Sequence, residues 1–247
     1  MKKILAFVAI IAGVFFVSCS KEESGKGRKL ILDKDSVSLH QKETVKITSN
    51  GTDVTYTSRN PYVADVEKNG EVTALFVGET VIDVKSNEGT AEFKVTVAPR
   101  YHTFIEPCHD WTKTRKEVFT MHPNLSFSLN DDHWGAMVDI DKAMIILYEF
   151  DSFDKLKSSS ISISQDYAIE SMYFLAERYL PIGEKNNVYY FANGLTTTTF
   201  DTIIAMSKLP GYRIYGIYYF PYTPSKSSDM IEFNIPEFCN LPECWKE

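Results

Sequence analysis

Short segments in which every second residue is apolar fill residues 29–97. This alternation places one face of a strand in a core and the other face in water. Three pairs that end in glycine separate the segments and supply the positive φ angles that hairpin turns need: Asn50-Gly51, Asn69-Gly70 and Glu88-Gly89. Seven or eight strands within about 70 residues predict an all-β sandwich of two sheets over residues 28–98.

The second part of the chain, residues 101–247, combines helical and alternating patterns and predicts an α+β domain. Asp110 is a favourable N-cap for a helix that begins at Trp111. A second helix is expected after Ser164, with Pro181 just beyond its end. Alternation predicts strands at 125–129, 134–140, 143–150, 161–163, 188–191, 200–206 and 212–220.

The order of these elements, a helix and about three strands repeated once, indicates a duplicated α-βββ unit. Strands joined by short connections form an antiparallel sheet, and the two main helices are expected on one face of it. In element order the first half is similar to the helix-plus-strands unit of small outer-membrane assembly lipoproteins and of β-lactamase inhibitor proteins. No motif is shared, so no functional residue is carried over.

The first domain carries a family pattern in three stretches. These are Val63-Ala64-Asp65-Val66, Asn69-Gly70-Glu71-Val72-Thr73-Ala74 and Gly78-Glu79-Thr80-Val81-Ile82. Their order resembles the bacterial immunoglobulin-like (Ig-like) domain of group 2. Tyr56 stands where that family usually has Trp, and it fills the core with a large ring whose hydroxyl needs a partner. The resemblance implies an Ig-like sandwich that serves as a spacer in bacterial surface proteins and has no enzymatic site.

The N-terminus predicts a bacterial lipoprotein signal peptide at residues 1–18. Residues 4–16 are mostly apolar and follow a short basic start, and small Ser18 precedes Cys19. This layout resembles a lipobox, in which a diacylglycerol is attached to the cysteine and the preceding peptide is removed. We therefore expect lipidation of Cys19, with the polar residues 19–27 as a tether. An ordinary secretory leader or an uncleaved anchor helix is the alternative.

The predicted localisation is therefore that of an exported protein, lipid-anchored in the outer membrane or on the cell surface of a Gram-negative bacterium. Lys21-Glu22-Glu23 also resembles the short acidic export signal of surface lipoproteins in Bacteroidetes. Without Lys2 and Lys3, the 26 basic residues fall to 24 against 33 acidic ones, a formal net charge of −9. A chain of this charge has no electrostatic reason to bind nucleic acid.

Three cysteines remain after Cys19, which in an exported protein indicates one disulfide and one free thiol. Cys239 and Cys244 could close a small loop, or one of them could bind Cys108. The sequence leaves both pairings open.

Candidate chemistry is sparse. His102, Cys108, His109 and Asp110 form the densest cluster of metal-ligand types, but their spacing matches no zinc motif. No Gly-x-Ser-x-Gly elbow is present. We therefore expect no metal, no cofactor and no enzymatic activity, with paired carboxylates for glycan hydrolysis left open.

The last predicted strand is unusually rich in tyrosine. Tyr212 shares one face with Tyr218, and Tyr215 shares the other face with Tyr219. If one face lies outside the core, Tyr212, Tyr215 and Tyr219 are candidate ligand-binding residues, since exposed rings offer rigid contact area. The alternative is a thick core that covers both faces.

Together these patterns predict a surface lipoprotein in which an Ig-like spacer presents a binding domain for adhesion or ligand capture. Its partners would be the membrane, through the lipid, and a protein or glycan ligand. The alternatives are an envelope glycan hydrolase with unidentified carboxylates and a structural accessory of an outer-membrane complex.

Overall fold

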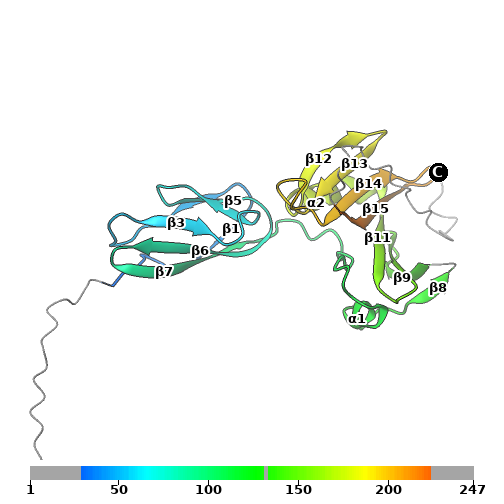
Figure 1. The fold of residues 1–247 in the computed structure, drawn as a ribbon. Helices are drawn as coiled ribbons and strands as arrows, with labels where there is room; N and C mark the ends of the chain where they lie inside the picture. Colours follow the sequence, from blue (N-terminus) through cyan, green and yellow to red (C-terminus); the bar gives the residue numbers. More distant parts are fainter. Residues whose placement is uncertain (1–28, 131–132, 224–247) are drawn as a thin grey trace, which may run out of the picture.

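The computed structural model describes residues 29–130 and 133–223. The predicted signal peptide, Cys19, the tether, Cys239 and Cys244 lie outside these residues. Two β-rich domains follow one another and are joined by an extended connection (Figure 1). Across the described part of the chain, no helix has both the length and the apolar character that a membrane crossing requires.

The first domain is a sandwich of two sheets, as predicted. One sheet has the order β1-β7-β6-β3, with β1 (Ser36–Leu39), β7 (Gly89–Val97), β6 (Gly78–Ser86) and β3 (Thr55–Ser58). The other has the order β2-β5-β4, with β2 (Thr44–Lys46), β5 (Glu71–Ala74) and β4 (Ala64–Val66). Strand β1 runs parallel to β7, and the other pairs are antiparallel. Ile47, Val72, Ile82 and Phe93 form its buried centre.

The turn between β4 and β5 shows why this sequence needs glycine. Gly70 has φ +84°, and a Cβ atom there would lie 2.8 Å from the Tyr56 ring. Tyr56 packs against the core of the sandwich. The ring that replaces the family's Trp is thus accommodated by the glycine of the Asn69-Gly70 turn.

The second domain is one antiparallel sheet with two helices, which confirms the predicted fold class. Its first unit consists of α1 (Arg115–Thr120), β8 (Ser128–Asn130), β9 (His133–Asp139), β10 (Met144–Phe150) and β11 (Leu156–Ser164). Its second unit consists of α2 (Ala168–Ala176), β12 (Leu180–Lys185), β13 (Val188–Ala192), β14 (Thr202–Lys208) and β15 (Ile214–Pro221). Each unit therefore has four strands, where the pattern predicted about three.

The two units meet at the middle of the sheet. Its order is β12-β13-β14-β15-β11-β10-β9-β8, so the last strands of the two units pair with each other. In this central pair, Ile161 lies opposite Ile217. Both helices pack on the same face, since Val118 of α1 and Leu175 of α2 belong to one core with Ile161 and Ile217.

The strand that the pattern missed is β12. Pro181 predicts the end of the second helix, because proline cannot donate a backbone hydrogen bond. Strand β12 is the edge of the sheet, and its register against β13 shifts between Pro181 and Gly183. An edge strand tolerates proline, because one side of it needs no hydrogen-bonding partner.

The first helix begins later than predicted. Thr114 is its N-cap, and Thr114 and Glu117 form a capping box in which each side chain binds the other residue's backbone N–H. Asp110 instead accepts hydrogen bonds from the backbone and hydroxyl of Thr112. The reciprocal capping box satisfies two free N–H groups at once, so it determines the helix start. Trp111 consequently lies before the helix.

Both faces of β15 are buried, so for Tyr219 the alternative of a thick core holds. Ile217 and Tyr219 lie in the core beneath the helices, and Ile214 and Tyr218 lie in a second buried cluster. Tyr219 is 0% exposed. The physical reason is that a strand with apolar side chains on both faces is more stable when other parts of the protein pack against both of them.

A candidate ligand-binding cleft

An open cleft of about 530 Å³ lies in the second domain, between the segment before α1 and the connection from β13 to β14. Hereafter "the cleft" denotes this space. The polar and aromatic side chains that line it are those of Glu106, His109, Asp110, Trp111, Thr112, Asn193 and Asp201. Pro107, Cys108 and Met121 complete the lining.

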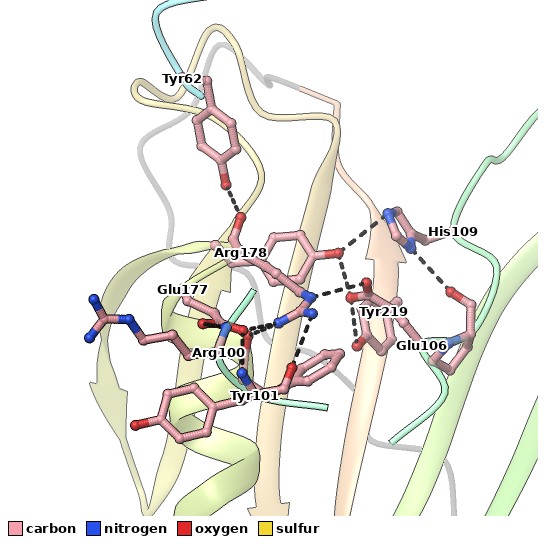
Figure 2. Close-up of polar contacts among 11 residues, drawn as sticks. Tyr62, Arg100, Tyr101, Glu106, His109, Glu177, Arg178 and Tyr219 are labelled. Carbon is pink, nitrogen blue, oxygen red and sulfur yellow. Dashed lines mark hydrogen bonds and ion pairs between the residues drawn. The ribbon is translucent and has the colours of Figure 1, made fainter. Parts of the chain in front are cut away.

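One wall of the cleft rests on a carboxylate network around the half-buried Glu106 (Figure 2). Glu106 Oε1 accepts hydrogen bonds from the hydroxyls of Tyr179, at 2.6 Å, and Tyr219, at 3.2 Å. Burial, and then the nearby Glu106 charge, raise the pKa of both tyrosines well above its ordinary value. Both therefore stay neutral donors. The His109 ring stacks on Tyr219 with centroids 5.5 Å apart.

Arg178 connects Glu106 to a second carboxylate, that of the buried Glu177. The Nη1 atom of Arg178 lies 2.5 Å from Glu177 Oε1, and its Nε lies 4.0 Å from Glu106 Oε2. Glu177 also accepts hydrogen bonds from the backbone N–H groups of Arg100, at 2.9 Å, and Tyr101, at 3.1 Å. The interdomain connection and the cleft wall thus belong to one polar network.

The Ig-like domain docks on the C-terminal end of α2. The last carbonyl groups of a helix lack partners inside the helix. Here the first domain supplies three donors: Gln41 Nε2 to Ala176 O at 2.9 Å, Val77 N to Glu177 O at 2.8 Å, and Tyr62 Oη to Arg178 O at 2.6 Å. Figure 2 shows the last of these contacts. The docking holds α2, and with it Glu177 and Arg178, in place.

The opposite wall of the cleft is organised by Thr202, which is fully buried. Its hydroxyl accepts a hydrogen bond from Trp111 Nε1 at 3.0 Å and donates one to Asp201 Oδ1 at 2.7 Å. Asn193 Nδ2 also donates to Asp201 Oδ1. An indole, a carboxylate and an amide are thereby held together at one side of the cleft.

Cys108 lies at the base of the segment that lines the cleft. Its thiol is free and buried, and burial raises its pKa. A bridge from Cys108 to Cys239 or Cys244 would involve residues outside the described part of the chain. The pairing of Cys239 with Cys244 falls outside the described residues.

The four metal-ligand types noted in the sequence do not all lie together. Cys108, His109 and Asp110 line the cleft, whereas His102 is exposed elsewhere. Within residues 29–130 and 133–223, no three His, Cys, Asp or Glu side chains are grouped so that they could hold a metal ion.

Of the tyrosines singled out as candidate ligand contacts, Tyr212 and Tyr215 are half-buried, and Tyr219 lies beneath the cleft as a support for Glu106 and His109. Sequence reasoning missed Glu106, Asn193 and Asp201. The available signal was the absence of regular periodicity around residues 101–112, since irregular segments on a rigid scaffold often carry function.

The segment that lines the cleft is also held from below by Tyr148. Cys108 N donates to Tyr148 Oη at 3.0 Å, and His122 Nε2 lies 2.7 Å from the same oxygen. Burial lowers the pKa of His122 from its ordinary 6.5 and raises that of Tyr148. The lowered pKa favours the neutral imidazole, whose Nε2 shares a hydrogen bond with the tyrosine hydroxyl.

We expect the second domain to lose stability as the pH falls below about 6.5. Below this pH the unfolded chain binds a proton at His122 more readily than the folded chain does. The free energy of unfolding therefore decreases by at most about 1.4 kcal/mol per pH unit, until the pH falls below the folded-state pKa of His122. Urea unfolding at pH 7.5 and 5.5, followed by tryptophan fluorescence, measures the change. His122→Gln should show a flatter dependence, and an unchanged one would contradict this assignment.

Comparison with known proteins identifies the first domain. Residues 28–97 match the family model described as bacterial Ig-like domain (group 2). No curated protein matches the chain. Solved structures that match include three parts of the surface-layer protein SbsC. Domains 1–6 share 13% identity over 77% of this chain and 21% of that chain, with a TM-score of 0.25.

The other two parts are similar to this chain to the same degree. Domains 5–6 share 14% identity over 81% of this chain and 86% of that chain, with a TM-score of 0.25. Domains 4–9 share 17% identity over 81% of this chain and 27% of that chain, with a TM-score of 0.24. The identification depends on the family match and not on these structures. Residues 28–97 are a bacterial Ig-like domain of group 2, which indicates a cell-surface protein.

Proposed function

We propose that this protein is a lipid-anchored protein of the bacterial surface whose Ig-like domain presents a ligand-binding domain. The observation that carries the proposal is the cleft. Every described residue that lines it belongs to the second domain, and the Ig-like domain docks on the end of α2. The docked spacer thus leaves the cleft open to a ligand.

The composition of the cleft supports binding. Ligand sites are concave, mostly apolar and equipped with a few well-held polar groups. Trp111, Pro107 and Met121 supply apolar surface, and Asn193 and Asp201 are held by mutual hydrogen bonds. We infer that the cleft accommodates a ligand of a few rings or side chains.

We further propose that binding is not followed by hydrolysis. Glycoside hydrolysis needs two carboxyl groups that are free to act as acid and as base or nucleophile. Glu106 is engaged by two tyrosine hydroxyls at Oε1 and faces Arg178 at Oε2. This arrangement leaves the carboxylate as a support for the wall.

The anchor is proposed from the lipobox-like residues before Cys19. Two or three acyl chains hold a protein at a membrane more firmly than a single chain, at about 0.8 kcal/mol per buried methylene. The Lys21-Glu22-Glu23 segment, which resembles a short export signal, and the Ig-like spacer are consistent with display outside the cell.

Gram-negative cells that express the full chain should capture fluorescent ligands from a panel of oligosaccharides and extracellular-matrix proteins. Cys19→Ala should abolish capture by the cells, because the protein leaves the membrane fraction and no longer incorporates a palmitate analogue. Asn193→Ala combined with Asp201→Ala should leave the protein displayed but reduce capture about tenfold or more.

Surface display of each variant is monitored by protease digestion of intact cells, and Asp65→Ala on the Ig-like domain serves as the matched control. Retention of Cys19→Ala in membranes would contradict the anchor. Full capture by the Asn193→Ala, Asp201→Ala protein would contradict the cleft as the binding site.

A further inference from the structure

We propose that the ligand of the cleft is an uncharged saccharide, which stacks on Trp111 and hydrogen-bonds to Asn193 and Asp201. The proposal rests on the proposed function, because it names the chemical class of ligand for the same cleft. Three properties of the site carry it: a fixed aromatic ring, the lack of lysine and arginine among the described lining residues, and a paired acceptor and donor.

The aromatic ring is Trp111, whose plane is fixed from its polar end. Its Nε1–H is bound to the buried Thr202 hydroxyl at 3.0 Å, so the indole cannot rotate freely. The residue is only half-buried and lines the cleft. A rigid ring offers a large contact area at a low cost in conformational entropy. The aliphatic face of a pyranose is a flat surface that matches such a ring.

The charges of the cleft argue against anionic ligands. Among the described lining residues there is no lysine or arginine, which disfavours phosphorylated, sulfated or carboxylated ligands. Glu106 faces Arg178 at 4.0 Å, and Asp110 faces Lys113 at 3.8 Å. Arg178 lies closer to Glu177, at 2.5 Å, so the cleft keeps a net negative charge that further disfavours anionic ligands.

The hydrogen-bonding groups are arranged in a way that suits hydroxyls. Asn193 Oδ1 accepts the backbone N–H groups of Asp201 and Thr202, both at 3.0 Å, which orients its Nδ2 toward Asp201. Asp201 Oδ1 is occupied by Asn193 and Thr202, and Oδ2 accepts no hydrogen bond within the described residues. Asp201 Oδ2 is thus an acceptor that lies next to a donor, the second N–H of Asn193 Nδ2. Neighbouring sugar hydroxyls, which donate and accept, complement this pair.

The aromatic and polar parts meet at one residue. The Thr202 hydroxyl accepts from Trp111 and donates to Asp201, so the ring and the carboxylate are separated by a single side chain. A sugar ring that stacks on the indole therefore has its edge hydroxyls near Asp201. This juxtaposition is what distinguishes the cleft from a generic apolar groove, such as the one between α2 and β12–β13 that Met172, Tyr173 and Phe191 line.

The test is binding of the chain from residue 20 to immobilised neutral gluco-, manno- and galacto-oligosaccharides. Sialylated and sulfated oligosaccharides, collagen and fibronectin are the comparison ligands. We expect binding to at least one neutral oligosaccharide and a change of tryptophan fluorescence on binding. Trp111→Ala should weaken the Kd tenfold or more, and Trp111→Phe should keep part of the affinity but lose the fluorescence change.

Trp134→Ala is the matched control. Trp134 is also half-buried, and it packs under Arg115 at 5.2 Å, in a separate groove on the α1 side. Near-ultraviolet circular dichroism confirms that each variant is folded, and Trp111→Phe provides a milder change if Trp111→Ala unfolds. Unchanged affinity of both Trp111 variants for the bound oligosaccharide would overturn the proposal.

Two further results separate this proposal from the proposed function. Binding of a charged glycan or a matrix protein that depends on Trp111 would refute the neutral-saccharide ligand while the cleft stays a binding site. The absence of binding to every ligand in the panel would refute both.

Discussion

Glu177→Ala lowers the free energy of unfolding of the second domain by about 3–5 kcal/mol, the range for a broken buried ion pair. Glu177 is 3% exposed and binds Arg178 as well as the backbone N–H groups of Arg100 and Tyr101. Its removal leaves a largely enclosed guanidinium with only the distant Glu106 as a charge partner, and two N–H groups without that acceptor. Each unsatisfied buried donor adds about 1–3 kcal/mol of desolvation cost.

Tryptophan fluorescence during denaturant unfolding reports on this domain alone, because all three tryptophans, Trp111, Trp134 and Trp245, follow residue 100. Glu43→Ala is the control, since Glu43 pairs with Arg100 at 2.8 Å but both side chains are about half exposed. Such a pair contributes about 0–1 kcal/mol. If the two variants lose equal stability, Glu177 does not anchor the junction.

Glu177→Gln refines the result. The amide oxygen can still accept a backbone hydrogen bond, but the charge opposite Arg178 is gone. We expect Glu177→Gln to lower the free energy of unfolding by an amount between those for Glu43→Ala and Glu177→Ala. We also expect faster proteolysis of the connection around Tyr101. This pattern would show that the Ig-like domain is held as a rigid support, and that its role exceeds that of a flexible spacer.

Tyr219→Ala reduces the stability of the second domain by about 3–5 kcal/mol, as expected for the truncation of a fully buried aromatic side chain. The ring lies in the core beneath the helices and supports the stacked His109, while its hydroxyl binds Glu106. Tyr219→Phe removes the hydroxyl alone and should cost about 0.5–1.5 kcal/mol. Denaturant unfolding of both variants measures the two contributions.

Tyr215→Ala is the matched control, because Tyr215 lies on the same face of β15 but is half-buried. Its truncation should cost clearly less than that of Tyr219. A surface ligand platform would behave in the opposite way: Tyr219→Ala would leave the unfolding transition in place and reduce ligand binding only. The two readouts therefore decide between a core residue and a ligand contact.

The first domain could be predicted almost completely, because its signals are local. Alternating apolar residues mark each strand, and the Asn69-Gly70 pair marks a turn whose geometry Gly70 meets with φ +84°. The feature that was not predicted is the docking of loops of the first domain on the end of α2. Gln41, Tyr62 and Val77 contribute donors to α2, and no local pattern distinguishes them from ordinary turn residues.

The second domain shows where local rules compete. Asp110 and Thr114 are both good N-caps, and Glu117 decided between them by completing a capping box. Pro181 ended the predicted helix region correctly but also hid β12, whose position at the sheet edge removes the penalty for proline. Tyr219 shows the same limit for burial, since alternation assigns a face but cannot tell whether that face is covered.

Most strands and turns follow from interactions among residues a few positions apart, and the residue pattern alone was sufficient for them. The cleft and the junction depend on folding. Trp111 and Thr202 are 91 positions apart, and Tyr62 and Arg178 are 116 apart. Their hydrogen bonds exist only after the sheet has brought distant segments together and excluded water from them, so no local pattern could indicate them.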